Sequence, residues 1–289
     1  MSISIFAKPA FLNINPHEPF SQRTKPLREG VGHLQRVSSI IRADQIAKEI
    51  GAKLNPESGY ENDVCIYVKP MVRKGDDFKF EGKPYLDIID GHNLGQLATK
   101  HPEVTVIVCS QADMETLTGV IPNKIIFIPQ HHCNFKRYIR TREGVRVVGA
   151  IGTKGAFPLL PKGLKEALGE RGIELLEFSR FFKREDIIDF YLKIDVQIVW
   201  RPYKKLLSNP LKIVNAASFG IPTIALDESA FKEMGDCYIP VHTLDEFLDR
   251  LDDLRTSPAL YNDYFHRCID KSDEYHIEKI GELYKELDK

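Results

Sequence analysis

The chain has 289 residues, 43% of them hydrophobic and 28% charged, which is enough for two domains with separate cores. Its formal net charge of -1 gives no overall field that would attract nucleic acid or an anionic membrane. No apolar run approaches the roughly 18 residues that span a bilayer, and the first residues lack the plan of a signal peptide. The five widely spaced cysteines match neither a zinc site nor a disulfide framework. We therefore expect a cytoplasmic protein without a metal site.

Short apolar runs recur along the chain and predict strands, several of them apolar on both faces as buried parallel strands are. The predicted strands cover residues 2–7, 64–68, 85–90, 104–110, 124–129, 145–151, 173–178, 196–200, 223–226 and 237–241. Helical patterns occur near residues 33–50, 93–100, 111–119, 161–171, 184–194, 209–219, 228–234 and 244–256. This alternation predicts an α/β protein with doubly wound parallel sheets.

A polar, basic segment at residues 131–144 interrupts the alternation and predicts a domain boundary. We expect an N-terminal domain over residues 1–140 and a C-terminal domain over residues 145–265. A charged helix at residues 268–289 is expected to cross back and complete the first domain. Residues 9–32, broken by four prolines, form no predicted element and are either a functional loop or a solvated one.

The segment Ser208–Ala225 is the most informative part of the sequence, because a turn opens a helical run that leads into a buried strand. We expect Ser208 or Asn209 to cap this helix and Pro210 to occupy its first turn. A capped helix N-terminus that follows a strand end can hold a phosphate. Lys212 is unfavourable to the helix dipole there unless it meets an anion. It is either a phosphate ligand or a solvated surface lysine.

Polar residues at the carboxyl ends of predicted parallel strands mark where a ligand would bind. His92 follows a strand of the first half and is either an acid, base or hydrogen-bond donor, or a structural histidine. Gly152, Thr153 and Lys154 follow a strand of the second half. This loop matches neither the P-loop nor the dinucleotide-binding pattern, and it either holds a diphosphate or is a simple tight turn. Arg201 adds positive charge after another strand of that half.

Three stretches of the second half resemble the GT-B superfamily of glycosyltransferases, most closely the retaining group called GT4-like. They are Val147–Gly152, Asp186–Val199 and Pro210–Ala225. The resemblance implies two Rossmann-like domains facing a cleft, with a C-terminal helix that crosses back to the first domain. It also implies a nucleotide-sugar donor, a UDP-, GDP- or ADP-sugar, held mainly by the C-terminal domain, and no tightly bound cofactor.

The resemblance also implies roles for individual residues. Lys212 would lie near the diphosphate or the sugar and take part in catalysis. Thr153 and Lys154, with Gly152, would form the phosphate loop. Arg201 and Asn209 would complete the set around the donor.

Two further candidates concern the ribose and the transferred sugar. Asn215 stands where many relatives carry a glutamate that grips the ribose, and Leu207 stands where they carry a second glutamate. An amide can still bond ribose hydroxyls as donor and acceptor. His92 is the candidate for contact with the transferred sugar.

We therefore expect a hexosyltransferase-type glycosyltransferase that retains anomeric configuration and needs no metal, as the resemblance implies. Its acceptor, a saccharide, a lipid-linked molecule or another compound, would bind the N-terminal domain near the basic segment 17–36. Two alternatives stay open. The missing glutamates favour a binding protein that has lost catalysis. The basic N-terminal segment would suit a transferase that modifies nucleic acid, for which the neutral overall charge is unfavourable.

Overall fold

The computed structural model describes residues 2–7, 37–70, 72, 78–91, 93–179, 183–203 and 206–289. The chain forms two compact units. Unit 1 comprises Met1–Gln130, Leu206–Asn209 and Ile277–Lys289, and unit 2 comprises His131–Lys205 and Pro210–His276. The chain therefore returns to unit 1 twice, once for a short segment and once for its C-terminal helix.

Unit 1 is built on a six-stranded parallel sheet in the order β2-β1-β3-β4-β5-β6. Its strands are β1 (Ile3–Phe6), β2 (Lys53–Leu54), β3 (Val64–Val68), β4 (Lys83–Asp87), β5 (Thr105–Val108) and β6 (Ile125–Phe127). All five residues of β3 are buried, which is why this strand reads as one continuous apolar run.

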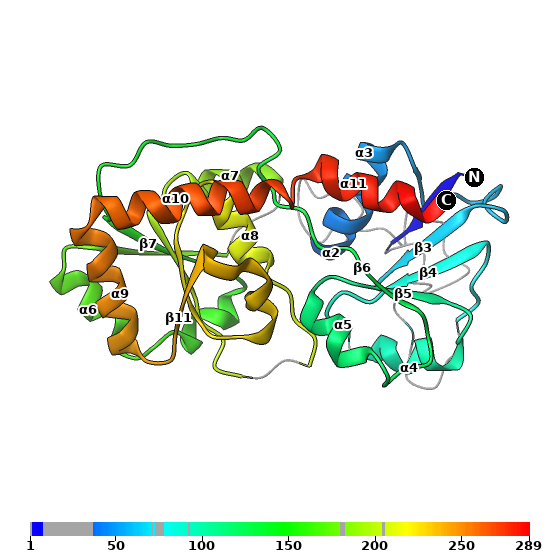
Figure 1. Ribbon diagram of the computed structural model, residues 1–289, viewed down its shortest axis with the longest axis horizontal. Helices are drawn as coiled ribbons and strands as arrows, with labels where there is room; N and C mark the ends of the chain where they lie inside the picture. The colour runs from blue at the N-terminus through cyan, green and yellow to red at the C-terminus, as the bar shows by residue number, and fades with distance from the viewer. Residues whose placement is uncertain are drawn as a thin grey trace. The chain divides into compact units, whose positions relative to one another are not determined.

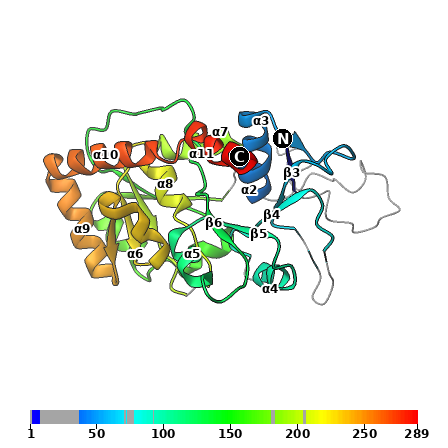
Figure 2. The same ribbon diagram turned by 45° about the vertical axis from the view of Figure 1, so that its right-hand side comes forward.

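Helices cover both faces of the unit 1 sheet (Figures 1 and 2). On one face lie α2 (Val37–Ser39), a π-helical turn η1 (Ile40–Gln45), α3 (Ile46–Ile50), α11 (Ile277–Lys285) and the last turn η4 (Glu286–Asp288). On the other face lie α4 (Asn93–Lys100) and α5 (Gln111–Leu117). Helix α11 packs closely on α3, because a side chain at Gly281 would begin 3.1 Å from carbon atoms of Glu49 and Ile50. The glycine thus permits the close approach of the two helices.

A buried ion pair fixes this helical layer to the sheet of unit 1. Nε of Arg42 donates to Oδ2 of Asp87 at 2.5 Å, and both side chains are almost completely buried. The same guanidinium donates to the carbonyls of Ile128 and Pro129 at 2.8 and 2.9 Å. Tyr284 of α11 donates to Asp87 at 3.4 Å. The carboxyl ends of β4 and β6 are therefore joined to the C-terminal helix.

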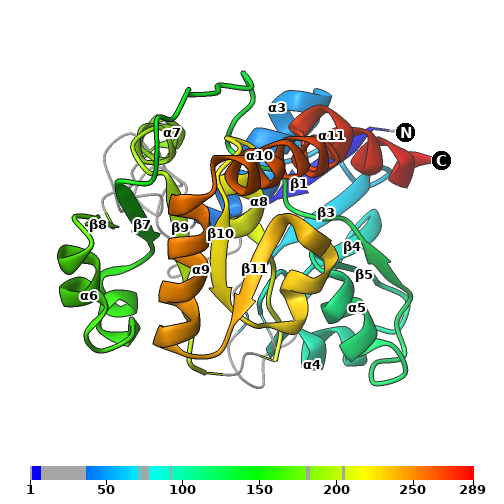
Figure 3. The same cartoon turned by 60° about the vertical axis from the view of Figure 1, so that its left-hand side comes forward.

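Unit 2 is built on a five-stranded parallel sheet in the order β11-β10-β9-β7-β8, which Figure 3 shows with α9 in front of it. Its strands are β7 (Val147–Ile151), β8 (Glu174–Phe178), β9 (Val196–Val199), β10 (Thr223–Leu226) and β11 (Tyr238–Val241). Its helices are η2 (Lys154–Leu159), α6 (Leu164–Glu170), α7 (Arg184–Tyr191), α8 (Leu211–Ala217), η3 (Ser229–Cys237), α9 (Leu244–Thr256) and α10 (Pro258–Asp273).

The side chains of β7 alternate between two apolar cores of unit 2. Val148 and Ala150 join the core that contains α6 and α9, whereas Val147 and Ile151 face the core that contains α7 and α8. Gly149 lies between them on the α7 side, where a side chain would begin 2.4 Å from Ile194. The glycine is therefore required by packing. The α/β class with two parallel sheets, predicted from the strand–helix alternation, is confirmed.

Three local features differ from the sequence-based expectations. The short edge strand β2 was not predicted, because its two residues are too few to give an apolar pattern. The 3₁₀ helix η2 was also not expected. The helix expected over residues 268–289 is interrupted at residues 274–276, between α10 and α11. At this break the buried His276 places its Nε2 3.1 Å from the carbonyl oxygen of Phe135.

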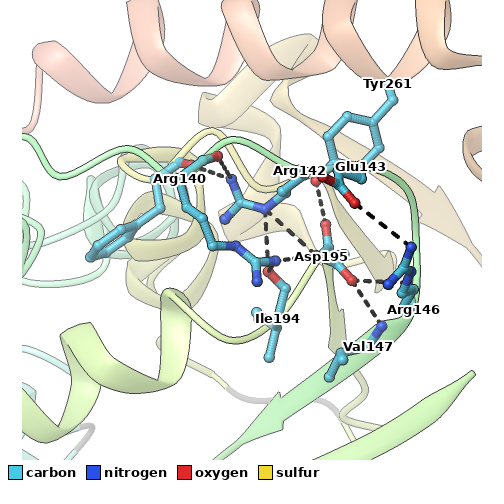
Figure 4. A network of polar contacts seen from close by, with 9 residues as sticks. Arg140, Arg142, Glu143, Arg146, Val147, Ile194, Asp195 and Tyr261 are labelled. Atoms are coloured by element: carbon cyan, nitrogen blue, oxygen red, sulfur yellow. Dashed lines mark hydrogen bonds and ion pairs between the residues drawn. The ribbon is translucent and has the colours of Figure 1, made fainter.

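The basic segment 131–144 is not a free linker, because it is bonded to the body of unit 2 (Figure 4). Arg140 forms an ion pair with Asp195, whose other carboxylate oxygen accepts the backbone N–H of Val147 at 2.9 Å. Arg142 donates to the carbonyl of Ile194 at 3.3 Å. The hydroxyl of Tyr261 on α10 donates to the carbonyl of Asp195 at 2.6 Å. One buried aspartate thus joins this segment to β7 and α10.

Candidate functional site

The carboxyl end of β7 opens into an exposed loop that carries three of the predicted donor-site residues. Gly152 donates its N–H to the carbonyl of Phe178 at 3.1 Å, which holds the loop against the end of β8. Thr153 and Lys154 follow and are exposed, and Lys154 begins η2. The side chain of Thr153 makes no capping hydrogen bond to this helix. The loop therefore presents a hydroxyl and an ammonium group on its outer side.

Lys212 of α8 reaches the same loop. A side chain at Gly152 would begin 3.5 Å from Nζ of Lys212 and 3.2 Å from Cβ of Ala156. The absence of a side chain at Gly152 thus leaves space for the ammonium group against the loop backbone. Residues that are sixty positions apart in the sequence are thereby brought together at one edge of the unit 2 sheet. That this edge binds an anion stays a prediction.

A buried polar network holds the first turn of α8 from beneath. Nε2 of Gln197 donates to the carbonyl of Lys212 at 3.0 Å and contacts Oγ1 of Thr223 at 3.1 Å. The hydroxyl of Tyr191 donates to Oε1 of Gln197 at 2.8 Å and also contacts the carbonyl of Lys212 at 3.3 Å. Sequence reasoning missed this network. Its signal was a glutamine inside the apolar strand β9, since a buried amide needs hydrogen-bond partners.

The start of α8 differs from its expected form. Pro210 itself is the residue before the first helical position, where Ser208 or Asn209 was expected, and it makes no side-chain capping hydrogen bond. Ser208 belongs to the short segment of unit 1, where its N–H donates to Oδ1 of Asp113 at 2.9 Å.

Arg201 lies at the carboxyl end of β9 and is engaged by a carboxylate. Its Nε and Nη2 atoms donate to the two carboxylate oxygens of Glu228, both at 2.6 Å, and its guanidinium lies over the ring of Phe231 at 5.3 Å. Both partners of the pair are mostly buried. Such a bidentate ion pair is strong and geometrically specific. A contact of Arg201 with a phosphate stays a prediction, and it would have to compete with Glu228.

The other predicted site residues are bonded elsewhere in unit 2, belong to unit 1 or lie outside the described residues. Oδ1 of the buried Asn215 accepts the backbone N–H of Cys133 at 2.8 Å, so this oxygen holds the 131–144 segment. Asn209 belongs to the segment of unit 1. His92 and the basic segment 17–36 lie outside the described residues. Contacts of these residues with a ribose, a donor or a sugar remain predictions.

The carboxyl edge of the unit 1 sheet carries polar groups that sequence reasoning did not single out. Lys69 after β3 forms an ion pair with Asp90 after β4. Lys69 and Ile89 both adopt left-handed backbone conformations, with φ of 44° and 48°, which is unusual for residues with side chains. On α5, burial raises the pKa of Asp113 to about 6, although hydrogen bonds from Ser208 and Ser110 oppose this. The signal for these residues was their position after predicted strands.

Neither a metal site nor a membrane-spanning helix is found among the described residues. Within the described part of the chain, no group of three or more His, Cys, Asp or Glu residues is placed to hold a metal ion. In the same residues, no helix combines the length and the apolar character needed to cross a membrane. Burial lowers the pKa of His132 to about 3, so this ring is neutral, and its centroid lies 5.3 Å from that of the His276 ring.

No protein-family model matches the chain, and neither does any curated protein sequence. Solved structures do match it. The chain is similar to HepE from Anabaena, solved in complex with UDP and glucose, with a TM-score of 0.58 and 13% identity over 99% of each chain.

It is also similar to TarM, with a TM-score of 0.52, 14% identity and coverage of 80% of this chain and 51% of that one. A chain of the Gap123 glycosylation-associated complex of Streptococcus agalactiae matches with a TM-score of 0.53, 13% identity and coverage of 80% and 55%. This chain thus spans about half the length of those two proteins. At these identities the likeness shows the fold alone, two α/β units that are each built on a parallel sheet.

Proposed function

We propose that the chain is a glycosyltransferase that takes a sugar from a nucleotide-sugar donor and binds the donor diphosphate on unit 2. Three independent lines support the proposal. The sequence resembles the GT-B superfamily over the donor segment. The fold is similar to that of HepE, which was solved with UDP and glucose. The observation that carries the proposal is the position of Lys212, whose Nζ lies against the glycine loop after β7.

The chemistry of this site follows from its charges. When the bond between sugar and diphosphate breaks, negative charge builds up on the departing nucleoside diphosphate. The ammonium groups of Lys212 and Lys154 offset that charge, and the backbone N–H groups around Thr153 donate to the phosphate oxygens. The network of Gln197 and Tyr191 keeps the first turn of α8 in place, so the cation is positioned before the donor arrives. Retention of configuration and a metal-independent reaction are further parts of the proposal, which the resemblance supports.

The acceptor is proposed to bind unit 1 at the carboxyl edge of its sheet. Asp90 is a carboxyl group that can accept a hydrogen bond from an acceptor hydroxyl, and Lys69 can donate one. These groups suit a polar acceptor that carries hydroxyl groups.

The proposed donor site is tested by substituting Lys212. We expect Lys212→Ala to lower the rate of sugar release from the accepted donor by about 100-fold, on the scale of removing one preorganised charge-stabilising group. The measurement is mass-spectrometric detection of hydrolysed or transferred sugar in a screen of UDP-, GDP- and ADP-sugars. Lys165→Ala is the matched control, since Lys165 is an exposed lysine of α6 in the same unit. Full turnover in Lys212→Ala would overturn the assignment of this residue.

A second candidate function is a binding protein with the same fold that has lost catalysis. It is favoured by the two positions at which relatives carry glutamates. Leu207 is buried in the apolar core of unit 1, and Asn215 uses its side-chain oxygen to hold Cys133. Calorimetric titration with nucleotide sugars, paired with the turnover screen, separates the candidates. A catalyst both binds and cleaves one donor, whereas the alternative predicts no cleavage of any donor.

A further inference from the structure

Two cysteines of unit 2 lie in contact with each other, although they are distant in the sequence. Cys237 ends η3, directly before β11, and Cys268 lies on α10. The thiol of Cys237 donates to the carbonyl of Arg267 at 3.3 Å, and the thiol of Cys268 donates to the carbonyl of Cys237 at 3.4 Å. This reciprocal arrangement places both sulfur atoms at one junction between η3 and α10.

The electrostatic surroundings make the two thiols unequal. The pKa of Cys237 is lowered, first by the neighbouring side chain of Cys268 and then by the positive charges of Lys271 and Arg267. The pKa of Cys268 is raised by the neighbouring Cys237 and by its own burial. A thiolate is the nucleophile in exchange with a disulfide, so Cys237 is the attacking sulfur and Cys268 the second one.

The other cysteines provide an internal comparison. Burial raises the pKa of Cys65 to about 11 and that of Cys133 to about 12. Cys133 has 8% of its surface exposed, against 5% for Cys237 and none for Cys268. Exposure alone would therefore favour reaction at Cys133. The contact between two thiols and the nearby cations favour reaction at Cys237.

We propose that Cys237 and Cys268 form a thiol–disulfide exchange site that reacts with low-molecular-weight disulfides. The thiolate of Cys237 attacks one sulfur of the small disulfide, forms a mixed disulfide and releases the first small thiolate. Cys268 then loses its proton, attacks the sulfur of Cys237 and releases the second small thiolate. Two electrons pass from the protein to the small disulfide, which becomes two thiols, and the protein gains one intramolecular disulfide.

The new bond would add a covalent link to the hydrogen bonds that join α10 to η3. Arg267 of α10 donates to the carbonyl of Asp236 at 3.1 Å, and Tyr275 beyond α10 donates to Glu233 of η3 at 3.2 Å. A disulfide between Cys237 and Cys268 closes a chain loop that contains β11 and α9. Closing such a loop restricts the unfolded chain, so the oxidised form of unit 2 is the more stable one.

The test uses the full-length folded protein and oxidised glutathione as the probe. After incubation, free thiols are blocked, the protein is digested and the peptides are mapped by mass spectrometry. We expect a disulfide between Cys237 and Cys268, with Cys65, Cys109 and Cys133 still free. Cys133→Ser should give the same result. Wild-type protein that keeps all five thiols free, or that is first modified at Cys133, would overturn the proposal.

Single variants separate the attacking thiol from the second thiol. Cys268→Ser should keep one glutathionyl group on Cys237, because the second step is blocked, and Cys237→Ser should leave Cys268 unmodified. If the serine hydroxyl disturbs the buried position on α10, Cys268→Ala serves the same purpose, and circular dichroism checks the fold of each variant. A folded Cys268 variant without a mixed disulfide at Cys237 would contradict the proposed order of attack.

Discussion

Arg42 in unit 1 and two lysines in unit 2 lie near the carboxyl edges of their sheets but have different surroundings. In unit 1, Arg42 and Asp87 are buried and bonded to each other and to the backbone. In unit 2, Lys154 is exposed, and Nζ of Lys212 lies beside the loop at Gly152, which has no side chain. A charged residue near a strand end can therefore hold the scaffold together or face a ligand. Its burial and partners decide which role it has, and the sequence shows neither.

The largest effect is expected when the buried Arg42–Asp87 ion pair of unit 1 is broken. Arg42→Met should lower the free energy of unfolding by about 3–5 kcal/mol, because Asp87 is left buried without its partner. Urea unfolding followed by circular dichroism measures the change. The double variant Arg42→Met/Asp87→Leu is the control and should recover much of the loss, since no lone charge remains. A single variant as stable as the wild type would contradict the structural role of the pair.

The fluorescence of the only tryptophan in the sequence reports on the folding of unit 2. Trp200 directly follows β9 and contacts the apolar core of unit 2. Its fluorescence midpoint in urea should stay near the wild-type value in Arg42→Met, because the substitution lies in unit 1. A fluorescence midpoint that falls with the circular dichroism midpoint would show that the damage extends to unit 2.

The next effect concerns the pH dependence of stability. The pKa of Asp113 is about 6 in the folded protein and its ordinary value is 3.8, so the folded state binds this proton more tightly. Its stabilising contribution is complete below about pH 4 and is lost as the pH rises to about 6, a loss of about 3 kcal/mol. Asp113→Asn should therefore gain stability relative to the wild type between those values. Identical pH profiles of the urea midpoints for the two proteins would show that this shift is absent.

The smallest effect concerns the glycine loop of unit 2. Gly152→Ala places a methyl group 3.5 Å from Nζ of Lys212 and should weaken binding of a nucleoside diphosphate by about tenfold, or about 1.4 kcal/mol. Gly155→Ala in the same loop is the matched control, since a side chain there would meet no atom within 4 Å. Calorimetric titration of both variants checks the difference. Equal affinities would mean that the space at Gly152 does not matter for the ligand.

Much of the fold could be predicted, because buried parallel strands leave a clear apolar signal. β3 and β9 are buried at every residue, and both were expected from their sequences. The short segment 206–209 could not be predicted to join unit 1. It does so through Leu207 in the apolar core and the bond from Ser208 to Asp113, and neither pairing leaves a local pattern.

The candidate site could be predicted where chemistry depends on local sequence. Gly152 and Lys212 were expected from a glycine loop and a helix start, and the structure brings them together. Partners distant in the sequence could not be predicted. Glu228 engages Arg201, and Cys133 engages Asn215, through pairings that only the fold creates. Both contacts give predicted ligand-binding residues a partner within the protein.

The most direct test of the account is calorimetric titration of UDP, GDP and ADP into the wild type, Lys212→Ala and Lys165→Ala. If Lys212 holds the diphosphate, one of the three nucleotides should bind the wild type and Lys165→Ala with equal affinity. The same nucleotide should bind Lys212→Ala at least about tenfold more weakly, because a charge-assisted contact to the diphosphate is lost. Equal affinity of the chosen nucleotide for all three proteins, or no binding of any nucleotide, would contradict a diphosphate site at Lys212.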